Sequence, residues 1–400
     1  MTPTSLYIYI YNGGNYSLKR LFLLALLISA VAMTRMDAVL MLVPSVCMAF
    51  LIKNKEKLIH RILVGLMGLL PFICWELFSL IYYGYPFPNT MYVKLSTDLP
   101  QLDYYRKGID FIFRSALVDS VLIIVPVIFI ILSVIYKSRD AMFIAAGVIL
   151  YILYVIYIGG DFMVGRHLTV PFFISVCDLI ILMDHNPSIK IRNVPLTLSS
   201  ILTVLLIIEA AWGVAIRPVA KTYLHDALWG DAKTDVADEK GHYYPYTGLI
   251  PYTRGLRNGI NTEKNFVAEE LAVIDEARSR GDKGFYGIGV SGMTAFFEQD
   301  EEPMYLTDRY GLMDPLLSHL PAIKMDDWRI GHMVRKEPEG YSESVATGEN
   351  LLENDGLREY YDKVLYIITG DIWDKNRIQT IIDINTGKYD HLLDDYISRQ

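Results

Sequence analysis

The sequence predicts a polytopic α-helical membrane domain followed by an α/β extracytoplasmic domain, and three observations support this fold class. Hydrophobic residues fill 52% of the 400 positions, and mean hydropathy is +0.28. Both values exceed those of most soluble domains and suit a membrane protein with a water-exposed part. The long apolar runs all lie before residue 217, whereas the remainder is mixed, acidic and interrupted by glycine and proline. We therefore expect two domains, residues 1–217 and 218–400.

The first apolar stretch, residues 20–53, is too long for one helix and has Thr34, Arg35 and Asp37 in its middle. Cations at both outer ends predict a hairpin whose tip, "TRMD", lies near the outer membrane surface. Five further runs have the roughly 18–22 apolar residues that a helix needs to cross about 30 Å of hydrocarbon. They are residues 62–83, 117–136, 141–158, 167–183 and 196–216.

Orientation follows from the short loops that carry Lys and Arg, at 53–61, 136–140 and 184–193. Loops of this kind stay in the cytoplasm. The alternating segments, namely loop 84–116, the hairpin around Asp161 and the domain 218–400, are then outside. The sequence therefore predicts a multi-pass protein of the cytoplasmic (inner) membrane with an extracytoplasmic C-terminal domain.

Composition also excludes several classes of function. The three cysteines all lie in apolar runs, which excludes a disulfide framework or a cysteine zinc site in the C-terminal domain. The net charge of −8 is not accompanied by a basic stripe, so we expect no nucleic-acid partner. No His or Cys spacing indicates a metal ligand set, although a divalent ion remains an alternative for the chemistry.

The C-terminal domain contains Gly287-x-Gly289-x-x-Gly292 after a strand-like run, with Asp308 further on. These are elements of a dinucleotide fingerprint. Repeated βα units do not follow, and the domain is expected outside the cytoplasm, so a closely packed strand-to-helix turn is favoured. Other expected elements are a helix at 265–281 and strands at 283–290, 303–308 and 363–370.

Charged residues at the outer face are the candidates for function. The segment "GGDFMVGRHLTV" places Asp161, Arg166 and His167 between two apolar runs, and Arg35 is expected at the same face. Charges at membrane depth are costly and generally face a cavity or one another. Two interpretations stay open for Arg35 and for this hairpin: salt bridges that stabilise turns, or a cationic site for a lipid-borne phosphate, to which arginine offers bidentate donors.

Other polar residues lie within the apolar runs or beside them. Glu76, Asp178 and Glu209 either mark a polar pathway or hydrogen-bond between helices, and the second interpretation is favoured. In loop 84–116, prolines are followed by "NTMYVKL", which is expected to lie along the interface. Tyr92 and Lys94 would be its headgroup-level anchors.

Five separated segments together carry a resemblance to a known family. Taken in this order over roughly residues 20–400, they resemble bacterial GT-C glycosyltransferases, in particular the mycobacterial terminal arabinofuranosyltransferases. The resemblance implies a GT-C-like membrane domain that transfers a pentose or hexose from a polyprenyl-phosphate donor to an extracytoplasmic glycan or cell-envelope acceptor. The segments are "MTRMDAVLMLVP", "YYGYPFPNTMYVKL", "GGDFMVGRHLTVPFF", "TDRYGLMDPLLSHLPA" and "WRIGHMVRKEPEGYSES".

The implied reaction needs a base for the acceptor hydroxyl and fixed cations for the released phosphate. Asp161 is the catalytic candidate in this scheme. The residues expected to bind the donor phosphate are Arg35, Arg166, His167 and Lys94, and those expected to reach the acceptor are Asp314, His332 and Arg335.

The resemblance also implies an earlier helix and an outer loop with one or two catalytic acids. The first 20 residues contain no Asp or Glu, so the membrane domain is expected to be N-terminally incomplete. The alternative function is therefore a catalytically degenerate membrane scaffold or partner subunit.

Overall fold

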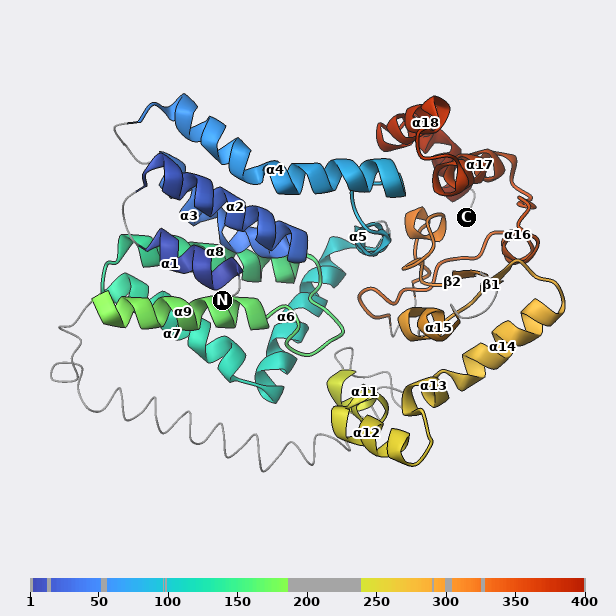
Figure 1. The fold of residues 1–400 in the computed structure, drawn as a ribbon, viewed down its shortest axis with the longest axis horizontal. Coiled ribbons are helices and arrows are strands. Elements are labelled where there is room, and N and C mark those ends of the chain that lie inside the picture. Colours follow the sequence, from blue (N-terminus) through green and yellow to red (C-terminus); the bar gives the residue numbers. More distant parts are fainter. Residues whose placement is uncertain are drawn as a thin grey trace. The chain divides into compact units, whose positions relative to one another are not determined.

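The protein is mostly helical in the computed structural model (Figure 1). The chain forms two compact units, one of Met1–Glu76 with Gln101–Asp226, the other of Leu77–Pro100 with Ala227–Gln400. The predicted boundary at 217/218, the predicted helix 196–216 and Glu209 lie outside the described residues. The structure describes residues 3–12, 16–51, 56–95, 97, 99–185, 239–289, 291–298, 304–324 and 328–398.

The first unit begins with the predicted broken hairpin. One helix ends at Thr34 because the backbone of Arg35 is extended, with φ −158° and ψ 97°. The chain then reverses, so that the next helix runs back beside the first (Figure 1). The break at "TRMD" is therefore confirmed. The elements are α1 (Pro3–Tyr11), α2 (Leu18–Thr34), the 3-10 helix η1 (Met36–Met41) and α3 (Val43–Leu51).

Two helices are long and apolar enough to cross a membrane, α4 (Leu58–Tyr83) and α8 (Arg139–Tyr157). They confirm the predicted helices at 62–83 and 141–158. The run 117–136 appears as α7 (Val121–Ile135), which follows α6 (Gln101–Val118) at a bend of 104°. The residues of α6 up to 116 were expected in an outer loop, and this expectation is wrong. The last predicted helix in the described part of this unit is α9 (Thr169–His185).

Helix α8 lies at the centre of the first unit and packs against η1, α3, α6, α7 and α9. Its Gly147 lies against the backbone of Met41, at a distance that leaves no room for a β-carbon. Close backbone approach through a small residue is a common way for membrane helices to associate. This contact fixes the broken hairpin against the helix that leads into the Asp161 segment.

The second unit is also mostly helical. Its short strands β1 (Gly284–Tyr286) and β2 (Tyr305–Thr307) pair in parallel, with Gly284 opposite Tyr305 and Tyr286 opposite Thr307. Little strand is present in the described residues, so the α/β character expected for this domain is limited to this pair. The helices are α5 (Asn89–Leu95), α11 (Glu239–Thr247), α12 (Leu249–Arg257), α13 (Thr262–Phe266), α14 (Ala268–Ser279), α15 (Ser291–Glu298), η3 (Leu317–His319), α16 (Tyr341–Thr347), α17 (Asp355–Thr369), α18 (Lys375–Asn385) and α19 (Asp390–Ile397).

Predictions for local elements in this unit had mixed outcomes. The strands expected around 283–290 and 303–308 are β1 and β2, and the helix expected at 265–281 is α14 preceded by the short α13. The strand expected at 363–370 is wrong, because these residues belong to α17. Asn354 caps the start of that helix by accepting from the N–H of Leu357 at 2.9 Å, which commits the segment to helix.

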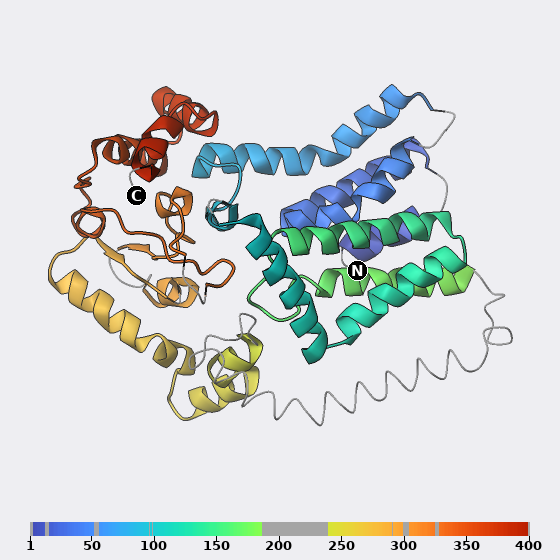
Figure 2. The same cartoon turned by 180° about the vertical axis from the view of Figure 1, so that it is seen from behind.

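The core of the second unit joins the end of α4 to the C-terminal helices, as Figures 1 and 2 show. Gly84, with φ +82°, ends α4 and lies against Ile367 of α17. Arg377 of α18 is buried and donates to the carbonyls of Ile81 and Tyr82, at 2.8 and 3.0 Å. These bonds satisfy carbonyl groups that an uncapped helix end leaves without partners.

Candidate functional site

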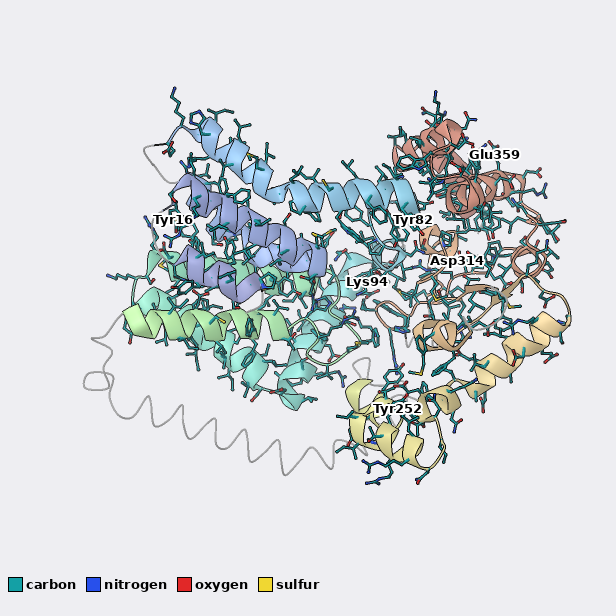
Figure 3. The ribbon with its side chains drawn as sticks, in the orientation of Figure 1. Tyr16, Tyr82, Lys94, Tyr252, Asp314 and Glu359 are labelled. Atoms are coloured by element: carbon teal, nitrogen blue, oxygen red, sulfur yellow. The ribbon has the colours of Figure 1, made fainter. Side chains whose placement is uncertain are left out.

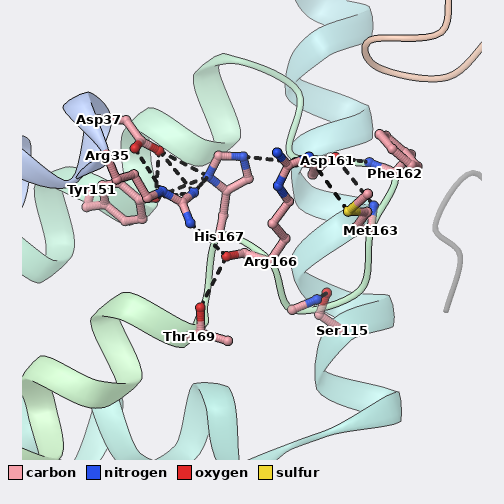
Figure 4. A network of polar contacts seen from close by, with 11 residues as sticks. Arg35, Asp37, Ser115, Tyr151, Asp161, Phe162, Met163, Arg166, His167 and Thr169 are labelled. Carbon is pink, nitrogen blue, oxygen red and sulfur yellow. Dashed lines mark hydrogen bonds and ion pairs between the residues drawn. The ribbon is translucent and has the colours of Figure 1, made fainter. Parts of the chain in front are cut away.

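The Asp161 segment is a glycine-containing loop between α8 and α9. Gly160 has φ +75° and lies against the ring of Phe111 on α6, where a left-handed backbone and close contact favour glycine. The N–H of Gly165 donates to the hydroxyl of Ser115 on α6 at 3.3 Å. The loop is therefore held against α6. It brings its charged residues to the break between α2 and η1, and we call the resulting group the hairpin cluster: Arg35, Asp37, Tyr151, Asp161, Arg166 and His167 (Figure 4).

Arg35 is the hub of this cluster. Its guanidinium donates from Nε to Oδ1 of Asp37 at 2.8 Å and from Nη2 to Oδ2 of Asp37 at 3.1 Å. Nη1 donates to the carbonyl of Arg166 at 3.1 Å. The bidentate geometry is the one that arginine and carboxylate favour. Arg35 thus makes the expected salt bridge and also fixes the backbone of the Asp161 loop.

His167 lies between the two carboxylates of the cluster. Its Nδ1 is 2.6 Å from Nη2 of Arg35 and 3.3 Å from Oδ2 of Asp37. Since a guanidinium can only donate, the shortest contact requires Nδ1 to accept. The ring proton is then assigned to Nε2, which is 3.2 Å from Oδ2 of Asp161. The cluster is therefore continuous from Arg35 through His167 to Asp161.

Asp161 has no exposed side-chain surface. Its Oδ1 accepts from the N–H of Phe162 at 2.7 Å and of Met163 at 3.4 Å. Its Oδ2 lies 3.4 Å from Nη1 of Arg166 and also faces His167. Both oxygens of this carboxylate therefore face groups of the protein itself. This geometry favours a role for Asp161 in orienting Arg166 over its expected role as the catalytic residue.

Arg166 differs from Arg35 in exposure. The Arg166 side chain is 51% exposed, against 28% for Arg35. Its guanidinium contacts Asp161 and the sulfur of Met163, the latter at 3.7 Å. Arg35 and Arg166 were expected to present their head groups to one phosphate, and this stays a prediction. The structure joins the two residues through the bond from Nη1 of Arg35 to the carbonyl of Arg166. The two guanidinium groups have different partners, and Arg166 is the more accessible one.

Two members of this arrangement escaped the sequence analysis. The hydroxyl of Tyr151, on α8, donates to Oδ2 of Asp37 at 2.9 Å and lies 3.1 Å from Nδ1 of His167. Ser115 binds the loop from α6. A tyrosine in an apolar helix, about two turns before the loop, was the available signal for Tyr151, whereas Ser115 gave none.

The remaining predicted site residues lie in the second unit. Lys94 is on α5 (Figure 3), and its stem lies beside Gly331. Arg335 is 1% exposed and donates to the carbonyl of Leu320 at 2.5 Å and to that of Val93. The ring of His332 packs edge-on against Tyr310, with centroids 5.3 Å apart. Arg335 thus joins α5 to the segment around residue 335, which favours a structural role over acceptor binding.

Asp314 is fully buried at the centre of the second unit (Figure 3). It accepts from the hydroxyl of Thr307 at 2.5 Å and from that of Tyr341, and from the N–H groups of Leu316 at 2.8 Å and Leu317 at 2.7 Å. Burial raises the pKa of this carboxyl, although these hydrogen bonds oppose the shift. Its contacts also favour a structural role over acceptor binding.

The glycine-rich turn after β1 leads into α15, as a strand-to-helix turn should. The N–H of Gly289 donates to Oε1 of Glu270 at 3.0 Å, and the hydroxyl of Thr294 donates to Oε2. A carboxylate of the protein therefore occupies the position where a dinucleotide fold would bind pyrophosphate. Asp308 accepts from three backbone N–H groups of its own loop. Both observations favour the packed turn.

Of the acids in the apolar runs, Asp178 is 1% exposed and accepts from Nδ2 of Asn12 at 3.0 Å. The bond joins α9 to α1, which is the interhelical pairing favoured from the sequence. Among the residues described, no group of three or more His, Cys, Asp or Glu is arranged to hold a metal ion.

No protein-family model, curated protein or solved structure matches the chain.

Proposed function

We propose that this chain is a membrane glycosyltransferase that moves a sugar from a polyprenyl-phosphate donor to an extracytoplasmic glycan or cell-envelope acceptor. The observation that carries the proposal is the half-exposed guanidinium of Arg166, held by the buried Asp161 at the end of α8. A fixed cation next to a membrane surface suits a lipid-linked phosphate, because it stabilises the charge that develops on the leaving group.

In the proposed reaction the acceptor hydroxyl oxygen forms a bond to the anomeric carbon, and the bond from that carbon to the phosphate oxygen breaks. The electron pair of the broken bond stays on the phosphate, and the hydroxyl proton passes to a base. Arg166 binds the phosphate, whereas Arg35 and Asp161 position it through its carbonyl and its guanidinium. His167, 8% exposed, lies between these two positioning residues. Lys94, in the second unit, is proposed as a further cation at the depth of the lipid headgroups.

The test measures binding of a polyprenyl-phosphate sugar to the full chain in proteoliposomes. Arg166→Ala should weaken binding about ten- to a hundred-fold, which corresponds to the roughly 1.5–3 kcal/mol of one charge-assisted contact. Arg166→Lys should restore only part of the affinity, because the bidentate geometry is lost. Arg139→Ala is the matched control: Arg139 is 58% exposed and pairs with Asp140 at 3.4 Å. Equal affinities for Arg166→Ala and Arg139→Ala would overturn the proposal.

A degenerate scaffold or partner subunit is the second candidate function. It is favoured by one observation: Asp37 and Asp161 both bind partners within the hairpin cluster. A transfer assay with radiolabelled donor separates the two candidates. Incorporation of sugar into acceptor supports the enzyme, whereas donor binding without transfer supports the partner subunit.

A further inference from the structure

The end of α4 in the second unit carries an exposed aromatic group. Phe78, Tyr82 and Tyr83 are 45%, 48% and 54% exposed. The rings of Phe78 and Tyr82 stack with centroids 5.2 Å apart, and those of Tyr82 and Tyr83 meet edge-on at 4.9 Å. Aromatic residues at the end of an apolar helix are typical of the membrane–water interface. They indicate the depth at which α4 leaves the bilayer.

Arg377 joins a second exposed segment to this point. Its Nη1 donates to the carbonyl of Ile81 at 2.8 Å and to that of Ile372 at 3.3 Å. Its Nε donates to the carbonyl of Ile367 at 2.8 Å. Because one nitrogen binds both carbonyls, the turn between α17 and α18 is fixed beside the last turn of α4. Arg377 itself is 1% exposed, so it acts as an internal clamp.

The clamped turn exposes an unusual amount of apolar surface. Trp373 is 73% exposed, and Ile372 is 36% exposed. The turn is nevertheless well ordered by hydrogen bonds: the N–H of Trp373 donates to Asp371 at 2.9 Å, and Asp374 caps α18 at the N–H of Asn376, at 2.8 Å. Ile368 and Ile382, on the two helices that the turn connects, are also exposed.

We infer that Ile372 and Trp373 form a membrane anchor, which inserts into the headgroup region of the bilayer that α4 crosses. The inference rests on the proposed membrane location of α4 and adds a lipid-binding surface to the C-terminal unit. Tryptophan suits this position because its ring is apolar and its N–H can reach polar groups. Asp371 and Asp374 flank the anchor, and carboxylates are costly at greater depth. The surface therefore fits zwitterionic headgroups better than anionic ones.

The test uses the full chain in phosphatidylcholine vesicles, with a photoreactive phenylalanine analogue at position 373. Val273 on α14 is 45% exposed and gives a matched control position in the same unit, away from α18 (Figures 1 and 2). We expect lipid adducts at 373 and only background at 273. Adducts at 373 with a second copy or another protein, or equal lipid labelling at both positions, would overturn the anchor.

Fluorescence gives a second measurement that does not depend on the analogue. Trp373→Phe should remove part of the tryptophan emission that brominated phosphatidylcholine quenches, and more with bromines near the headgroup than near the bilayer centre. Trp328→Phe, which changes a tryptophan only 7% exposed, should leave the quenched part unchanged. Alkaline extraction tests the membrane location separately from the anchor. Release of the protein from vesicles overturns the membrane location and the anchor together, whereas retention with unquenched Trp373 overturns the anchor alone.

Discussion

Asp161 in the first unit and Asp314 in the second are equally buried but have opposite kinds of partner. Asp161 lies against the cationic Arg166 and the ring of His167. Asp314 accepts from two hydroxyls and two backbone N–H groups. These four donors are all uncharged, and burial raises the pKa of its carboxyl. Asp161 therefore leads outward to an exposed guanidinium, whereas Asp314 closes a network inside the core.

The difference shows why burial alone does not identify a functional acid. Both carboxylates were singled out from the sequence, one for catalysis and the other for the acceptor. What separates them is whether the network that each one stabilises ends at a group that a ligand can reach. The network of the hairpin cluster ends at such a group, because the side chain of Arg166 is 51% exposed.

The largest effect is expected for Asp314→Ala. The substitution leaves the hydroxyls of Thr307 and Tyr341 and the N–H groups of Leu316 and Leu317 without their acceptor. Each buried polar group left without a partner costs about 1–3 kcal/mol. We expect the free energy of unfolding of the second unit to fall by at least about 3 kcal/mol in a denaturant titration.

Asp275→Ala is the control, because Asp275 is 69% exposed and pairs only at the surface with Arg278. It should change stability by less than about 0.5 kcal/mol. Similar losses for the two variants would contradict the structural role of Asp314.

A smaller effect separates the two arginines of the hairpin cluster. Arg35→Ala removes bonds to Asp37, to Tyr151 and to the Arg166 carbonyl. It should destabilise the first unit by about 2 kcal/mol, because the ion pair of Arg35 with Asp37 is only partly exposed. Arg166→Ala should cost less than about 1 kcal/mol. The two variants are compared by thermal unfolding in detergent. A larger loss of stability for Arg166→Ala than for Arg35→Ala would contradict the assignment of Arg35 as the more structural of the two arginines.

The smallest effect concerns pH. Burial lowers the pKa of His319, although its bond to the Pro315 carbonyl opposes the shift. The folded state therefore prefers the neutral ring, and its contribution to stability is lost as pH falls below the unfolded value of about 6.5. The contribution of Asp314 to stability depends on pH in the opposite direction. Because its pKa is raised in the folded state, this contribution falls as pH rises from the unfolded value of about 3.9.

His319→Gln should thus reduce the fall in Tm between about pH 7 and pH 5, a window set by the unfolded histidine. Titration of Tm for the two proteins measures this. Parallel Tm curves over that window would show that His319 is not the responsible group.

Several features of the fold could be predicted because they depend on local pattern. The apolar length of α4 and α8 predicted both helices, and the charges of Arg35 and Asp37 marked the break after α2. The strand predicted at 363–370 is wrong, because helical spacing extends through this segment. Buried Leu357, Tyr360, Tyr361, Val364 and Ile367 recur at that spacing through α17.

Helix α6 was missed for a related reason. Its polar residues were assigned to an interfacial loop, although Tyr104, Gly108, Phe111 and Ser115 lie on one buried face. In the candidate site, the sequence predicted the meeting of Arg35 with the Asp161 loop. It could not predict that the two guanidinium groups take different partners, because this depends on where α8 places Tyr151 and on the packing of Gly147 against Met41.

The clamp by Arg377 also has a consequence for biogenesis. Its guanidinium binds the carbonyl of Ile81, 296 residues earlier in the chain. At about 5–20 residues per second, a ribosome needs roughly 15–60 seconds to synthesise the intervening chain. During that time the end of α4 has to persist without its final hydrogen-bond partners. Truncation before α18 would leave it in that state for good, so the nascent helix end should be a binding site for chaperones until translation is complete.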